Sequence, residues 1–144
     1  MVNYKSDGVF EAPVEKVWKL LTEEHTPEKV VKIHSNIQKV KILQQTPTSQ
    51  KQEVTAQGPD GKPMVYQLQF TFKPPQGFDM AWLTGPFTGS KCTHTYTPMG
   101  AKTKVVVSGD FKCPGMDDKS IVKIVDDMMG HAFDADNAYL RSMR

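Results

Sequence analysis

Residues 117–143 read DDKSIVKIVDDMMGHAFDADNAYLRSM, and this stretch decides the fold. Asp117 and Asp118 favour a helix start, because carboxylates there accept hydrogen bonds from free N–H groups and offset the helix dipole. At 1.5 Å per residue, a helix of this length would be about 40 Å long and could cross a whole sheet. One face is apolar at helical spacing and contains Ile121, Val125, Met128, Met129, Ala132, Phe133, Ala135, Tyr139, Leu140 and Met143.

The chain before this helix reads as strands joined by short turns. Within 64–73, apolar and wetter residues alternate with a period of two, which is typical of a strand with one buried face. Pro114 and Gly115 end the last strand before the helix. Short connections, including a hairpin signal at 58–61, predict an antiparallel meander. We expect its strands at about 36–45, 50–57, 64–73, 78–82, 90–97 and 102–112.

One more strand and two short helices open the chain. The first strand is expected at about 2–11, since Pro13 cannot continue a ladder but suits the first turn of a helix. Apolar residues at helical spacing then predict an amphipathic helix over 14–24. Thr26 is a good N-cap and Pro27 a good first residue for a second helix, which should end near His34.

This order of elements predicts one α+β domain over 1–144, with a curved sheet of about seven strands wrapped around the C-terminal helix. A long helix touches a curled sheet closely over only part of its length, so the gap is either a pocket or a packed core. A Met-rich helix facing an aromatic sheet favours a pocket for a hydrophobic molecule. We expect its wall and binding residues to be Tyr66, Leu68, Phe70, Phe78, Met80, Trp82, Cys92, His94, Tyr96, Val105, Val107, Phe111, Val125, Met128, Met129, Ala132 and Phe133.

Several segments together resemble a known superfamily. They are VFEAPVEKVWKLL at 9–21, LTGPFTG at 83–89, GAKTKV at 100–105, SGDF at 108–111 and the long final helix. The chain resembles the START-like, or SRPBCC, superfamily over nearly its whole length. That superfamily has a helix-grip fold and includes the major birch-pollen allergen and the polyketide cyclase/dehydrase group.

The resemblance implies a hydrophobic tunnel between the sheet and the final helix, holding a lipid, sterol, polyketide or similar ligand. It leaves three functions open: a carrier without catalysis, a cyclase or dehydratase, and an interaction module such as a chaperone-ATPase activator. No subgroup motif carries a catalytic set over to this chain. Of these three functions, we favour the carrier without catalysis.

Charge and composition limit the classes of partner and the cellular location that we expect. The formal net charge is +2 with scattered lysines, so we expect no nucleic acid partner. No apolar run is long enough for stable membrane insertion, and the N-terminus lacks a signal peptide, so we expect a cytoplasmic protein. Cys92 and Cys113 are too far apart for a CxxC motif and are expected to be reduced. We expect no cofactor, and the oligomeric state stays open.

Cys92, His94 and Tyr96 alternate on one strand and therefore share a face. The residues between them are wetter, so we expect this face to point inward. His94 and Tyr96 are then candidate acid/base groups in the pocket, with polar binding as the alternative.

Asp136 is the least expected residue of the helix stripe, because a buried carboxylate is costly unless it is paired or neutral. One interpretation makes it an acid/base group or ligand anchor with a raised pKa. The interpretation we favour places it where the helix leaves the sheet, beside water or a lysine.

The histidines elsewhere give no metal motif. Asp127, His131 and Asp134 share helical spacing but lie off the apolar stripe, which favours a solvated face with an ion pair. His25 and His34 flank the second helix without a carboxylate cluster at a matching metal-ligand spacing. We therefore expect no metal ion. The glycines of 85–89 precede a strand rather than a helix, which excludes the usual nucleotide-binding loop.

Overall fold

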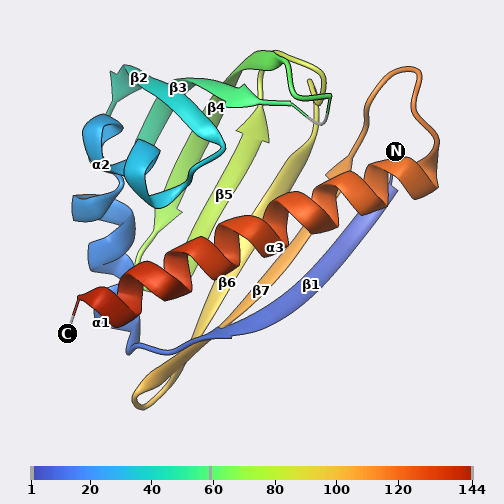
Figure 1. The fold of residues 1–144 in the computed structure, drawn as a ribbon. Helices are drawn as coiled ribbons and strands as arrows, with labels where there is room; N and C mark the ends of the chain where they lie inside the picture. The colour runs from blue at the N-terminus through green and yellow to red at the C-terminus, as the bar shows by residue number, and fades with distance from the viewer. Residues whose placement is uncertain (1, 59, 144) are drawn as a thin grey trace.

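Seven antiparallel strands form one sheet, and a long helix crosses its face (Figure 1). The computed structural model describes residues 2–58 and 60–143. The elements are, in chain order, β1 (Val2–Phe10), α1 (Val14–Lys19), η1 (Leu20–Glu24), α2 (Pro27–Ile33), β2 (Ile37–Gln45), β3 (Ser49–Gln57), β4 (Pro63–Lys73), β5 (Gly77–Trp82), β6 (Lys91–Met99), β7 (Lys102–Phe111) and α3 (Asp118–Ser142).

The strand order is β1-β7-β6-β5-β4-β3-β2, so the strands from β2 to β7 form a meander and β1 closes its far edge. The segment α1–η1–α2 carries the chain from one edge strand, β1, to the other, β2. In Figure 1 these helices lie near the C-terminal end of α3, while the N-terminus lies near its start. The predicted α+β helix-grip architecture with seven strands is confirmed.

The inward face of the sheet and one face of α3 supply the core. Phe111 on β7 and Val125 on α3 are both fully buried, at 0% exposure. Asp117 caps α3 as predicted, because its side chain accepts a hydrogen bond from the Ser120 backbone N–H. The C-terminal half of α3 is also fixed to β1. The Asn137 side chain accepts from the Glu11 N–H at 3.1 Å and donates to the Val9 carbonyl.

The first predicted helix differs from the expectation in one respect. Residues 14–24 are helical, but only Val14–Lys19 is α-helical, and Leu20–Glu24 forms a π-helical turn. Such turns are rare and occur frequently at functional sites. The second helix follows the prediction, since the Thr26 side chain accepts a hydrogen bond from the Lys29 N–H and Pro27 occupies the first turn.

Three smaller expectations have mixed outcomes. Cys92 and Cys113 are free, in agreement with the sequence. In the hairpin at 58–61, Gly61 has the positive φ of 81° that such turns require, whereas Pro59 lies outside the described residues. Among the described helices, none is both long and apolar enough to cross a membrane.

Candidate functional site

A partly open cavity of about 200 Å³ lies between α3 and the inward face of the sheet. It sits toward the β1 edge, where β1, β7, β6 and β5 face the middle of α3. Its wall is mostly apolar or aromatic, with a few polar side chains. The lining residues are Tyr4, Ser6, Asp7, Gly8, Phe10, Leu21, Phe78, His94, Tyr96, Val105, Val107, Asp126, Met129, Gly130, Ala132, Phe133 and Asp136.

The cavity contains eight of the expected wall residues, and binding by any of them stays a prediction. These are Phe78, His94, Tyr96, Val105, Val107, Met129, Ala132 and Phe133. The other nine lie outside this cavity wall: Tyr66, Leu68, Phe70, Met80, Trp82, Cys92, Phe111, Val125 and Met128. They instead belong to the core or pack against it. The space is therefore displaced from the centre of the sheet toward β1.

Sequence reasoning missed the contribution of β1 to the cavity. Tyr4, Ser6, Gly8 and Phe10 line it at a period of two, a signal that was present in the sequence. Gly8 allows α3 to approach closely, since a Cβ there would lie 2.8 Å from Cζ of Phe133. Phe133 also packs on Phe10, with ring centroids 4.9 Å apart.

The face carrying Cys92, His94 and Tyr96 points inward, as expected. Cys92 and Tyr96 are buried, and His94 lies in the cavity wall. The His94 ring stacks on Phe78, with centroids 4.4 Å apart and planes at 12°. This stacking fixes the imidazole plane relative to the cavity.

These polar groups are held in their neutral forms. Burial lowers the pKa of His94 to about 4, against an opposing effect from the Asp136 charge. Burial raises the pKa of Tyr96, and it raises the pKa of Cys92 to about 12. At neutral pH the cavity wall therefore offers an uncharged imidazole and an uncharged phenol, while the neutral Cys92 thiol lies outside this wall.

A second cluster adjoins this wall. His25 follows η1, His34 follows α2, and Asp136 lies on α3, yet their side chains meet. Asp136 Oδ1 lies 3.2 Å from Nε2 of His25 and 2.9 Å from Nε2 of His34. The two Nε2 atoms are 3.1 Å apart. We refer to His25, His34 and Asp136 as the His–His–Asp cluster.

This cluster corrects two expectations about Asp136. The side chain faces two histidines rather than water or a lysine. Burial raises the pKa of Asp136, but the close imidazoles of His25 and His34 outweigh burial, so its pKa is lowered rather than raised. Asp136 is therefore a carboxylate partner for both histidines, although it lies far from them in the sequence.

His25 is charged more easily than a free histidine. Burial lowers its pKa, but contact with Asp136, the Asp136 charge, the Leu20 carbonyl and Glu24 outweigh burial, so the pKa of His25 is raised. When His25 is protonated, it therefore pairs with the Asp136 carboxylate and links α3 to the segment after η1.

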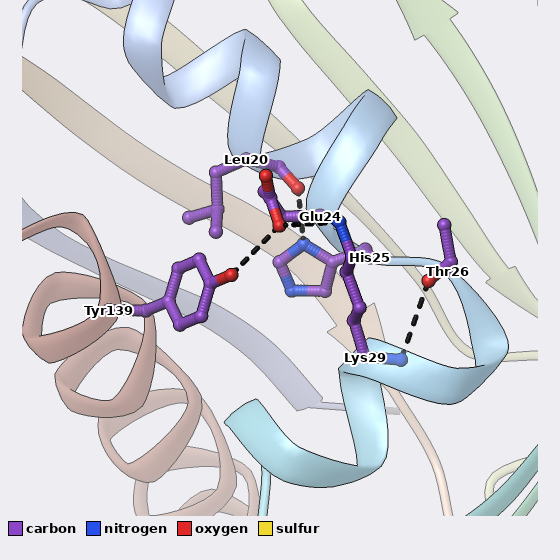
Figure 2. Close-up of polar contacts among 6 residues, drawn as sticks. All are labelled: Leu20, Glu24, His25, Thr26, Lys29 and Tyr139. Carbon is purple, nitrogen blue, oxygen red and sulfur yellow. Dashed lines mark hydrogen bonds and ion pairs between the residues drawn. The ribbon is translucent and has the colours of Figure 1, made fainter. Parts of the chain in front are cut away.

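Neighbouring contacts hold His25 in place (Figure 2). His25 Nδ1 lies 2.8 Å from the Leu20 carbonyl oxygen. Beside it, the Tyr139 hydroxyl of α3 donates to Glu24 at 2.8 Å, and Lys29 of α2 donates to the same Glu24 oxygen at 3.1 Å. Three segments are therefore tied together around the histidine.

The other candidate residues lie away from these sites. Asp127, His131 and Asp134 are exposed on α3, as expected of a solvated face, but no salt bridge joins them in the described chain, so the expected ion pair is wrong. A separate hollow of about 440 Å³ lies on the other side of the sheet. Its wall is mainly outward polar residues of the strands, such as Gln69, Asp79 and Thr93.

Comparison with known proteins identifies the family to which this fold belongs. A family model described as polyketide cyclase/dehydrase and lipid transport matches residues 1–142. A search of the curated proteins by sequence finds no significant match.

Solved structures with the same fold include three of known description. The Zhui aromatase/cyclase from a Streptomyces species has a TM-score of 0.79 at 16% identity, covering 99% of this chain and 95% of that one. Ara h 8.0201 has a TM-score of 0.80 at 17% identity, with 97% of each chain covered. A START superfamily protein from Mycobacterium smegmatis has a TM-score of 0.78 at 14% identity, with 99% of each covered. Identities this low show the shared fold alone.

Proposed function

This chain belongs to the polyketide cyclase/dehydrase and lipid transport family, and from that premise we propose that it binds a small hydrophobic molecule between α3 and the sheet. The observation that carries the proposal is the cavity of about 200 Å³ with its largely apolar wall. An apolar cavity of about 150 Å³ is enough to hold a benzene-sized guest. Drug-sized sites begin at about 300 Å³.

The size of the cavity limits the guest. In this conformation it accommodates one or two rings or a short acyl segment. A larger lipid or polyketide would need α3 to move away from the sheet, or part of the ligand to remain outside.

The polar groups limit the guest further. Tyr96 keeps its hydroxyl proton because burial raises its pKa, and His94 is neutral because burial lowers its pKa to about 4. Neutral donors and acceptors suit a hydroxyl or carbonyl oxygen on the ligand. We propose a largely apolar guest with one uncharged polar group.

Catalysis of the cyclase or dehydratase kind is the second candidate, favoured by the position of His94 and Tyr96 in the wall. A general base works best when its pKa lies near the operating pH. An imidazole with a pKa of about 4 is a weak base at neutral pH. For this reason we place binding ahead of catalysis.

Filling the cavity tests the proposal. Ala132 lines the cavity, and Val122 lies on the exposed side of the same helix at 39% exposure. We expect naphthalene and 1-naphthol to bind the wild type and Val122→Phe with similar affinity, measured by ligand-detected NMR. Ala132→Phe should weaken binding at least tenfold, because the new ring occupies the space of the guest.

Equal binding by all three proteins would place the guest elsewhere and contradict the proposal. Absence of binding to the wild type at the solubility limit of both compounds would contradict it as well. Circular dichroism of each variant checks that the fold is retained.

A further inference from the structure

Three side chains that belong to no common sequence motif have potential metal-ligand atoms close to one another. They are Nε2 of His25, Nε2 of His34 and Oδ1 of Asp136, with mutual separations of 3.2, 2.9 and 3.1 Å. We propose that the His–His–Asp cluster binds one divalent transition-metal ion of the zinc and iron(II) class. This inference does not depend on which molecule occupies the cavity.

The spacing of the three atoms fits such an ion. Metal–ligand bonds of about 2.0–2.1 Å to imidazole nitrogen and carboxylate oxygen place tetrahedral ligands about 3.3 Å apart. At the same bond lengths, adjacent ligands of an octahedral ion are about 2.9 Å apart. Two edges of the observed triangle, 3.2 and 3.1 Å, lie between these values, and the third, 2.9 Å, matches the octahedral value. An ion would need only a small adjustment of the three side chains.

The tautomer of His25 also fits. Its Nδ1 lies 2.8 Å from the Leu20 carbonyl oxygen, which can only accept a hydrogen bond. In the neutral ring Nδ1 therefore carries the proton, and Nε2 presents its lone pair to the cluster. A backbone carbonyl that orients a ligating histidine in this way is a regular second partner of metal sites.

The third observation concerns the carboxylate. Asp136 Oδ1 is buried, and among the described residues it is the one buried side-chain oxygen or nitrogen without a well-aligned hydrogen bond. The histidine nitrogens lie 3.2 and 2.9 Å from it without forming a hydrogen bond to it, and they are within hydrogen-bond distance of each other instead. A buried acceptor without an aligned donor is costly, and a cation at the centre of the triangle would satisfy it directly.

The ligand set selects the kind of ion. Two imidazoles with one carboxylate suit zinc or iron(II), whereas magnesium and calcium prefer all-oxygen sites. Three protein ligands leave at least one coordination position open. Asp136 belongs both to the cluster and to the cavity wall, so the open side adjoins the cavity.

The competing interpretation is an ion pair that only ties α3 to the segment around α2. Both interpretations are compatible with the raised pKa of His25 and the lowered pKa of Asp136, because these shifts describe the cluster without an ion. They differ in whether added metal binds here, so the test measures binding and its location together.

The experiment uses the full chain, stripped of metal with a chelator and titrated with zinc chloride. The sequence has four histidines, so four imidazole signals report on the site by NMR. We expect saturable binding of one equivalent, with the His25 and His34 signals shifting and those of His94 and His131 remaining in place. The same concentration of magnesium should shift none of them.

Two variants provide the matched comparison. Asp136→Asn keeps the size of the side chain but removes its charge, and it should weaken zinc binding at least tenfold by equilibrium dialysis. His131→Ala removes an exposed histidine of the same helix and should leave zinc affinity unchanged.

The proposal is overturned if the wild type shows no saturable zinc binding. It is also overturned if Asp136→Asn binds zinc as tightly as the wild type, or if the His131 signal shifts in place of the two cluster signals. Should Asp136→Asn fail to fold, the pattern of shifts in the wild type decides by itself.

Discussion

His94 is an imidazole stacked on an aromatic ring in the cavity wall, and its environment opposes a positive charge. It stacks on Phe78 and lines the cavity beside Tyr96. The pKa of His94 falls from 6.5 to about 4 through burial. The unfolded chain therefore binds one more proton here than the folded chain between these two pH values. Stability from this residue is present above about pH 6.5 and is lost as the pH falls toward 4.

Replacing His94 with phenylalanine should remove this pH dependence while keeping the stacked ring. Between pH 7 and pH 5 we expect the wild type to lose about 2 kcal/mol more unfolding free energy than His94→Phe. Urea unfolding of both proteins at both pH values measures the difference.

The comparison between the two proteins is needed because His25 acts in the opposite direction. Its pKa is raised, so its pairing with Asp136 is fully present below its unfolded pKa and is lost as the pH rises through its folded pKa. Equal losses for wild type and His94→Phe would show that His94 is charged or hydrated in the folded state.

For single residues, the sequence predicted which face of a strand or helix a side chain occupies, but not which distant side chains it contacts. The period of two correctly placed Cys92, His94 and Tyr96 on the inward face. Asp136 was recognisable as a carboxylate within an apolar stripe, but its partners were not. His25 and His34 lie about a hundred residues earlier in the chain. They meet Asp136 only through the placement of α3 against α2, which no local spacing encodes.

At the scale of elements, α3 is bound to the sheet by one face only. Val125 is fully buried, whereas Val122, less than one turn earlier, is 39% exposed. Truncating a buried side chain removes its burial and leaves a cavity, while truncating an exposed one does neither. The two valines therefore form a matched pair on one helix.

Val125→Ala should lower the free energy of unfolding by about 2 kcal/mol. Val122→Ala should change it by no more than about 0.5 kcal/mol. Chemical denaturation of both variants and the wild type gives the two differences. Equal effects at the two positions would mean that this face of α3 does not contact the sheet.

The types and approximate bounds of the helices and strands could be predicted from local patterns, because caps, prolines and hydrophobic periodicity are features of a few neighbouring residues. The π-helical turn Leu20–Glu24 was not predicted. Changing from α to π geometry shifts the backbone by one residue and leaves the apolar spacing nearly unchanged. The sequence therefore reads as one continuous helix, although this turn ends next to His25 and positions the Leu20 carbonyl beside its ring.

For the whole molecule, the separation between α3 and the sheet varies along the helix. At Gly8 the Phe133 ring comes close to β1, because the glycine has no side chain in its way. Around this contact, from β1 across to Phe78 and His94, the cavity of about 200 Å³ remains. A packed core and a cavity were equally compatible with the sequence, since displacements of an ångström decide between them. The cavity lies nearer β1 than the aromatic strands β4 and β5 indicated.

The proposed function depends on this cavity accepting a guest, and methionine methyl NMR tests this binding directly. Met129 lines the cavity, whereas Met99 lies at the end of β6 and is 52% exposed. With carbon-13 in the methionine methyl groups, titration with naphthalene should produce a saturable shift of the Met129 signal and leave Met99 unchanged. A Met129 signal that stays in place up to the solubility limit of naphthalene would contradict the account.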